Sequence, residues 1–312
     1  MNMLLDDSVV HYAWDNTLAP RLEVEPGSTL TFRTRDSSDL YYTPDSSQED
    51  VAHKGTLKGH PLSGPVRVRG AAPGDTLAVT VLDVAPAREF GWTAIRPGRG
   101  LLPEAEFPRP FLQIWELAGD GVARMRQRRD IAVPIAPFPG IMGTALPEAG
   151  VFSTIPPRKN GGNMDQKHLT RGTTLYLPVW VEGALFSVGD AHAAQGDGEV
   201  CVTAVEMCAT VTLRLDLIPG RAIPEPQLRT AGPLCAEMGA RGWFATTAQG
   251  PDLHENARRA VRYLVEHLVS ERSLSREEAY VLCSVCADLK ISEIVDSPNW
   301  LVSAFLPEAV FI

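Results

Sequence analysis

The chain has 312 residues, a formal net charge of −9 and a sequence pI near 5.3, and its densest basic run, residues 124–129, is short, so a nucleic-acid partner is not expected. No segment approaches the ~18–20 apolar residues of a membrane-spanning helix, and the N-terminus lacks the basic and apolar regions of a signal peptide. The five cysteines are odd in number and lack the spacing of a disulfide framework, so we expect a reduced, cytoplasmic protein without a membrane partner.

The first 225 residues predict many short strands joined by turns. Glycine (26) and proline (25) are scattered along the chain, and few long helical patterns occur before residue 250. Pro-Gly turns lead into alternating segments at 30–33 and 77–82. Further strands are predicted at 173–181 and 184–188. The longest predicted strand, 200–217, is apolar on both faces in its first half, as expected when both sides of a strand are covered.

The pattern becomes helical after residue 250. Asp252 is placed to cap a helix that runs to about residue 270, and Ser275 with Glu278 forms a capping box that opens a second helix. An extended segment follows at 301–305. We therefore predict an α+β, β-rich fold, with a sandwich- or barrel-like β body and a helical pair near the C-terminus. Residues 1–225 would form a β-rich domain that carries most site motifs, and residues 226–312 an α+β portion packed on it, unless both make one compact domain.

The densest polar cluster in an apolar region is residues 189–199. Asp190 and His192 are two residues apart, so in extended backbone their side chains point the same way. A carboxylate and an imidazole make a workable site for Zn²⁺ or a similar ion. The structural alternative is a polar hairpin loop with incidental charges, and the spacing alone favours neither.

Two other segments contain candidate polar residues. Asp165 follows an Asn/Gly-rich stretch, where an Asx turn is the more common role and a third metal ligand or orienting carboxylate is the functional one. His60 begins a loop of two glycines and two prolines within seven residues. Such a loop has a fixed shape, which makes His60 a candidate for a site, although single histidines are more often structural.

Glu206 is an unexpected carboxylate on a face predicted to be buried. It follows Val202 and Ala204 on the same side of the predicted strand. A buried carboxylate must be paired, bound to a metal or protonated. An ion pair with Arg158 or Arg214 is the structural alternative.

Taken together, these segments resemble the acetamidase/formamidase family. The residues that carry the resemblance are GHPLSGPVRVRGAAPGDTLAV (59–79), FGWTAIRPGRGLL (90–102), PIAPFPGIMGTALPEAG (134–150), GGNMDQKHL (161–169), GTTLYLPVWVEGALFSVGDAHAAQGDGEV (172–200) and AYVLCSVCADLKISEIVD (279–296). They span most of the chain in the expected order, and the GDAHAAQGDGEV segment is the most specific. Residues 41–58 do not align firmly, which leaves the shape of the pocket, and with it the substrate preference, open.

The resemblance implies hydrolysis of a short aliphatic amide, such as formamide or acetamide, to a carboxylate and ammonia. It also implies a β-rich fold with an α+β portion, a metal ion and assembly into a homo-oligomer. Carried over by position, the motif residues are His60, Asn163, Asp165, Asp190, His192, Gln195, Glu199 and Glu206.

We assign roles to these residues as a hypothesis. Asp190 and His192 would hold a divalent metal ion, zinc or alternatively calcium or another divalent ion, with His60 and Asp165 as further ligands. The remaining residues would be catalytic: Glu199 moves the proton from water to the departing ammonia, Asn163 or Gln195 donates to the oxyanion, and Glu206 orients a ligand.

Three alternatives remain open from the sequence. The same site could act on another amide, such as a cyclic or urea-like compound. A β domain could bind a metal or small amide without turnover, although the acids Asp190 and Glu199 count against this. Finally, the glycine-rich loops could only build turns in a structural protein.

Overall fold

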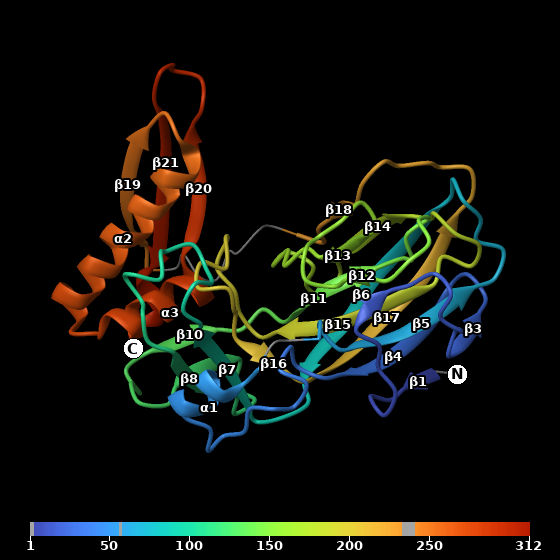
Figure 1. Ribbon diagram of the computed structural model, residues 1–312, viewed down its shortest axis with the longest axis horizontal. Coiled ribbons are helices and arrows are strands. Elements are labelled where there is room, and N and C mark those ends of the chain that lie inside the picture. The colour runs from blue at the N-terminus through green and yellow to red at the C-terminus, as the bar shows by residue number, and fades with distance from the viewer. Residues whose placement is uncertain (1–2, 56–57, 233–240) are drawn as a thin grey trace.

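The computed structural model describes residues 3–55, 58–232 and 241–312. Two β-sheets lie face to face, and a smaller sheet with two helices stands beside them (Figure 1). None of the sheets in these described ranges closes into a barrel. The predicted α+β, β-rich class is thus confirmed, and the β body is a sandwich.

The strands form the following sheets. The six-stranded sheet has the order β1 (Met3–Leu5), β4 (Ser28–Thr34), β17 (Ala209–Ile218), β6 (Thr76–Pro86), β14 (Thr174–Pro178) and β18 (Gln227–Arg229). The ten-stranded sheet has the order β10 (Ala132–Pro134), β9 (Val122–Met125), β8 (Phe111–Glu116), β7 (Phe90–Ile95), β16 (Glu206–Met207), β15 (Phe186–His192), β11 (Phe138–Gly143) and β13 (Gly161–Asn163), with β5 (Leu62–Val68) paired to β15 and β3 (Leu22–Val24) paired to β5. The smaller sheets are β12 (Phe152–Ser153) with β2 (Ala13–Trp14), and β19 (Trp243–Gly250), β21 (Trp300–Pro307) and β20 (Asp288–Glu293).

The core of the sandwich follows from the alternation of apolar residues. In β17, Val211, Leu213 and Leu215 are fully buried, while the residues between them are more exposed, as expected for a strand with one face on the core. Across the two sheets, the rings of Phe32 and Phe186 meet edge to face at 6.1 Å. This contact joins β4 to β15, the strand that ends in the candidate site.

The predicted strand 200–217 is wrong over its first six residues. Glu199 and Val202 have left-handed backbone angles (φ 42° and 75°), and the Val202 amide donates to the Glu199 carbonyl at 2.8 Å. This tight turn reverses the chain, so pairing resumes only in β16 and β17. The preceding strand extends further than predicted, because β15 continues to His192 rather than ending at Val188.

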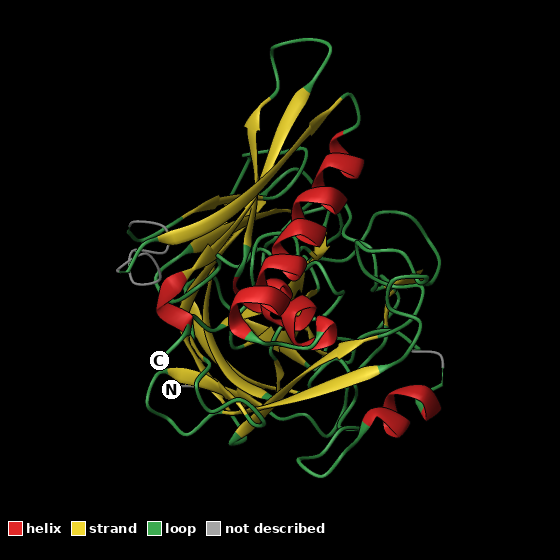
Figure 2. Ribbon diagram, turned by 90° about the vertical axis from the view of Figure 1, so that its left-hand side faces the viewer, coloured by secondary structure: helices red, strands yellow, loops and turns green. Residues whose placement is uncertain are grey.

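The two C-terminal helices and the last extended segment match the prediction, but strands β19 and β20 were not predicted. Helix α2 (Leu253–Arg272) begins after the cap Asp252, and α3 (Arg276–Cys286) begins with the Ser275–Glu278 capping box. The predicted extended segment is β21. Figure 2 shows α2 along the three-stranded sheet, which it contacts through β19 and β21. A 3-10 turn, η1 (Glu308–Val310), ends the chain.

A short helix, α1 (Gln48–His53), was not predicted. It lies in the segment that did not align, and it begins with a capping box of Ser47 and Asp50. Val51 packs into a small apolar cluster with Tyr42 and Trp92 and with two residues of β8. This contact fixes α1 against β7 and β8, at the edge of the candidate site.

The division into two domains at residue 225 stays a prediction. One large apolar cluster includes core residues of the sandwich and of α2 and α3. No helix within the described residues is long and apolar enough to cross a bilayer.

Candidate active site

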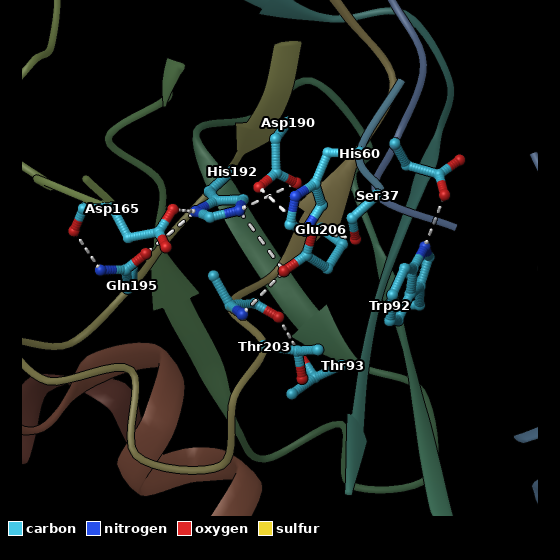
Figure 3. Close-up of polar contacts among 12 residues, drawn as sticks. Ser37, His60, Trp92, Thr93, Asp165, Asp190, His192, Gln195, Thr203 and Glu206 are labelled. Atoms are coloured by element: carbon cyan, nitrogen blue, oxygen red, sulfur yellow. Dashed lines mark hydrogen bonds and ion pairs between the residues drawn. The ribbon is translucent and has the colours of Figure 1, made fainter. Parts of the chain in front are cut away.

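The candidate site lies where β15 and β16 meet in the ten-stranded sheet (Figure 3). His192, at the end of β15, is directly opposite Glu206, at the start of β16. Asp190 belongs to the same strand as His192. Asp165 follows β13, and its backbone N–H donates to the carbonyl of Gly140 in β11 at 3.2 Å. Antiparallel pairing of strands that are distant in sequence thus brings the predicted residues together.

The imidazole of His192 is the centre of this cluster. Its Nε2 atom is 3.5 Å from Asp190 Oδ1 and 3.4 Å from Glu206 Oε1. Its Nδ1 atom is 4.0 Å from Asp165 Oδ1. The exposed fractions of His192, Asp190 and Glu206 are 1%, 3% and 2%, so these charged or polar groups are removed from bulk water.

Three buried atoms in the cluster have no hydrogen-bond partner among the described residues: Asp165 Oδ1, Asp190 Oδ1 and His192 Nε2. Buried polar atoms in folded proteins almost always have a partner. The convergence of these three atoms therefore indicates a site for a bound group that would contact all of them. Ligand atoms of these three residues lie within 4.8 Å of one another. Carboxylate oxygen and imidazole nitrogen are ligands of divalent cations, and the residues present therefore fit such an ion.

A second possible ligand group consists of His192, Glu199 and Glu206. Glu206 Oε2 accepts a hydrogen bond from Ser37 Oγ at 2.6 Å, and Oε1 accepts one from the Ala204 amide at 3.0 Å. These bonds hold the carboxylate facing His192.

The structural alternative for Glu206, an ion pair with Arg158 or Arg214, is wrong. In the described part of the chain, neither Arg158 nor Arg214 pairs with it, and Arg214 instead contacts Asp216 at 2.7 Å. Glu206 is buried, as expected, but it is held by a serine hydroxyl and a backbone amide.

Gln195 connects two members of the cluster. Its Oε1 atom is 2.9 Å from His192 Nδ1, and its Nε2 atom donates to the backbone carbonyl of Asp165 at 2.6 Å. An Nδ1–H donated to Gln195 leaves His192 Nε2 free to bind a metal, which is how neighbours commonly orient histidine ligands. Both ends of the amide are engaged, so Asn163 is the better placed of the two predicted oxyanion donors.

His60 and Asn163 line the same cavity as the acids. The His60 amide donates to Thr154 Oγ1 at 2.7 Å, and its Nε2 atom is 3.9 Å from Asp190 Oδ2. Asn163 Oδ1 is buried and has no hydrogen-bond partner in the described ranges. The cavity has a volume of about 540 Å³, and Asp165, Asp190, Glu199 and Glu206 all line it.

The electrostatics of the cluster favour a positive charge at its centre. Burial disfavours the ionised form of Asp190, but His60 and His192 outweigh it and lower the pKa of Asp190. Burial likewise opposes the charged form of His192, yet Glu206 and Asp190 raise its pKa well above 6.5. Burial raises the pKa of Asp165 to about 8. Burial together with the charge of Asp165 raises the pKa of Glu199 well above 4.5.

The backbone of the site is unusual. Asp165, Asp190 and Glu199 adopt left-handed angles, with φ of 44°, 54° and 42°, a conformation that is unfavourable for residues with a side chain. Such strain persists where the surroundings enforce it, and it concentrates at functional sites.

Several residues of the site were not predicted. Ser37 and Thr203 line the cavity, as do Lys54, Arg96 and Arg99. Lys54 follows α1, in the segment that did not align. Only the Ser47–Asp50 capping box of α1 was visible in the sequence, and it indicates a helix rather than a pocket wall.

An acetamidase and a formamidase have similar sequences. An acetamidase from Mycolicibacterium smegmatis is 30% identical over 270 residues, which cover 67% of this chain and 66% of that protein, just under two thirds of its length. A formamidase from Methylophilus methylotrophus is 26% identical over 367 residues, covering 98% of this chain and 90% of that protein.

Solved structures share the fold. A gamma lactamase from Delftia acidovorans has a TM-score of 0.89 at 27% identity, over 97% of this chain and 89% of that one. An acetamidase from Bacillus Halodurans has a TM-score of 0.68 at 30% identity, over 99% of this chain and 100% of that one. The sequence profile of the Acetamidase/Formamidase family matches residues 2–152 and 148–312, and the chain therefore belongs to this family.

Proposed function

We propose that this protein is a metal-assisted amidohydrolase that cleaves a short aliphatic amide to a carboxylate and ammonia. The observation that carries the proposal is the convergence of buried, unpartnered ligand atoms of Asp165, Asp190 and His192, two of which, Asp165 and Asp190, line one cavity. Family membership supports amide hydrolysis as the reaction.

Asp190, His192 and Asp165 would hold the metal ion, with His60 beside Asp190 as a further candidate. When bound, a divalent cation polarises a carbonyl group and lowers the pKa of water toward ~7. Zinc is our first choice because it combines imidazole and carboxylate ligands with an open position, and calcium or another divalent ion is the alternative.

Glu199 would move the proton. It lines the cavity next to His192, and burial raises its pKa well above 4.5, toward the range in which a carboxyl group both accepts and donates protons near neutral pH. Glu199 would take a proton from the attacking water and return it to the departing ammonia. Asn163 would stabilise the developing oxyanion through its side-chain amide.

Glu206 and Gln195 would orient the site. Glu206 is held by Ser37 and the Ala204 amide and faces His192 Nε2, while Gln195 faces the other ring nitrogen. Removing such supporting hydrogen bonds from a metal site typically costs ~10–100-fold in affinity or activity.

A cyclic amide is the second candidate substrate. The gamma lactamase from Delftia acidovorans shares the fold at a TM-score of 0.89, and a lactam presents the same planar amide to the site. Its opening would release an amine that stays attached to the product, so an assay of free ammonia distinguishes the two substrates.

The test combines elemental analysis of the purified protein with product assays on formamide, acetamide and a γ-lactam. We expect His192→Ala to lose both the bound metal and the hydrolysis. The matched control is His254→Ala, because His254 is exposed at the start of α2, and it should keep both. Full retention of metal and turnover by His192→Ala would refute the ligand assignment.

We also propose a cytoplasmic homo-oligomer. The four described cysteines, Cys201, Cys208, Cys283 and Cys286, are unpaired and buried, which is typical of a reducing compartment. Light scattering of the purified protein measures the assembly state.

A further inference from the structure

The cavity is larger than a simple amide requires. Acetamide has four non-hydrogen atoms, whereas cavities of about 300–1,000 Å³ hold ligands of drug size, and this one measures about 540 Å³. Its wall has two chemically different parts. One part consists of His60 and the four acids described above, and the other, which we name the basic wall, consists of Lys54, Arg96 and Arg99.

Lys54 is fixed by the packing of α1. Val51 anchors the helix in the apolar cluster with Tyr42, and the ammonium group lies over the ring of Tyr41 at 4.7 Å and donates to the carbonyl of Ser38. Burial, with the nearby positive charge of Arg96, lowers the pKa of Lys54 to about 8. The group therefore remains mostly charged at neutral pH.

Arg96 directly follows β7 and lies close enough to Lys54 to disfavour its charge. Its Nη2 atom is buried and has no hydrogen-bond partner among residues 3–55, 58–232 and 241–312. Its guanidinium group lies beside the hydroxyl of Tyr42, and its charge and hydrogen bonding oppose the burial that raises the pKa of Tyr42. Other arginines of this chain form ion pairs on the surface, such as Arg69 with Glu23 and Glu25.

The basic wall has no ion pair with a carboxylate in the described part of the protein. Asp36 and Asp39 affect Lys54 only through the field of their charges. They raise its pKa, but by less than burial lowers it. A partly buried guanidinium with a free N–H is suited to bind a carboxylate through two parallel hydrogen bonds.

We propose that the substrate of this enzyme is an amide that carries its own carboxylate, a short monoamide of a dicarboxylic acid. The amide group would lie at the acid and histidine cluster, and the carboxylate would bind Arg96 with support from Lys54 and Arg99. This inference rests on the proposed amidase function, and it adds the charge of the substrate. It also gives a reason for the volume of the cavity and for two positive side chains, Lys54 and Arg96, near each other on its wall.

The experiment compares succinamate with butyramide, an amide of the same chain length without the carboxylate. For the wild type we expect kcat/KM to be about 10- to 100-fold higher on succinamate, the range for a hydrogen bond to a charged group. Arg96→Met should reduce the ratio of the two kcat/KM values by at least about tenfold. The matched control is Arg171→Met, because Arg171 is exposed and does not line the cavity, and it should leave the ratio unchanged.

The possible results separate this inference from the proposed function. If butyramide is hydrolysed at least as well as succinamate, or Arg96→Met lowers both equally, the basic wall only balances the acids and the inference is wrong. If no amide releases ammonia, the proposed function fails. In that case, calorimetric titration with succinate still decides the anion site: binding to the wild type and to Arg171→Met but not to Arg96→Met supports it, and equal binding to all three overturns it.

Discussion

Gly140, in β11, lies against the candidate ligands Asp165, Asp190 and His192. A Cβ atom at this position would be 2.6 Å from Asp165 Oδ1, 2.7 Å from the Asp190 carbonyl and 2.9 Å from His192 Cε1. Each of these separations is shorter than real side chains allow, so any larger residue must displace the site. Glycine is required here by space rather than by backbone angle.

We predict that Gly140→Ala lowers kcat/KM about 100-fold, because a displacement of roughly 1 Å at the reacting groups has an effect of that order. Metal content should fall as well, while the circular dichroism spectrum stays that of a folded β protein. Gly232→Ala serves as the control, since an added Cβ meets nothing within 4 Å there. Activity of Gly140→Ala equal to that of the control would show that the ligands adapt.

At the scale of single residues, the sequence indicated the acids and histidines but not their supports. The two-residue spacing of Asp190 and His192 predicts side chains on one side, and the buried position of Glu206 marks it as unusual. Gly140 and Ser37 carry no comparable signal, because they act through a close approach and one hydrogen bond, both of which depend on strands far away in sequence.

At the scale of elements, a buried ion pair joins β20 to the segment that carries Asp165, and a hydrogen bond joins β20 to the loop that carries Glu199. Lys167 contacts Asp288, the first residue of β20, and the exposed fractions of these residues are 7% and 4%. Asp288 Oδ1 also accepts a hydrogen bond from the Asp197 amide at 3.2 Å. The C-terminal sheet is thereby attached to the loop at the site.

We predict that Lys167→Met lowers the free energy of unfolding by about 3–5 kcal/mol, since it leaves a buried carboxylate without its main counter-charge. Urea denaturation measures the change. Lys290→Met is the matched control: Lys290 approaches the same carboxylate at 3.7 Å, but its side chain is 50% exposed, so the expected loss is at most about 1 kcal/mol. Equal losses of stability in the two variants would contradict the idea that burial makes the Lys167–Asp288 pair the stronger one.

Caps that precede a clear helical pattern made α2 and α3 predictable, whereas turns that carry no sequence signal could not be predicted. The helices α2 and α3 begin where Asp252 and the Ser275–Glu278 box place them. The break before β16 depends on left-handed angles at Glu199 and Val202, two residue types that rarely adopt them. The apolar pattern around Val202 therefore predicted a continuous strand.

At the scale of the whole molecule, the pairing of strands could not be predicted. Strand β16 has only two residues and lies between β7 and β15, which are about a hundred residues apart in the chain. Alternation of apolar residues identifies a strand and its buried face, but it does not identify the neighbour. For this reason, the strand order of the sheet that brings the site residues together is known only from the structure.

Metal binding should stabilise the whole molecule. Four acids line one cavity, and an ion that binds only the folded state adds free energy of unfolding, about 2.7 kcal/mol at a concentration 100 times its Kd. We predict that a chelator lowers Tm by several degrees and that added Zn²⁺ restores it. His192→Ala should show a much smaller response in differential scanning calorimetry. An equal response would place the ion elsewhere.

The left-handed backbone of Asp165, Asp190 and Glu199 has a consequence for engineering. Glycine at these positions would relieve backbone strain of order 1–3 kcal/mol per residue. A screen that selects for heat resistance alone would therefore enrich glycine there and remove the acids that the proposed reaction needs. Libraries built to make this enzyme more robust should keep the three acids fixed and vary positions that do not touch the cavity.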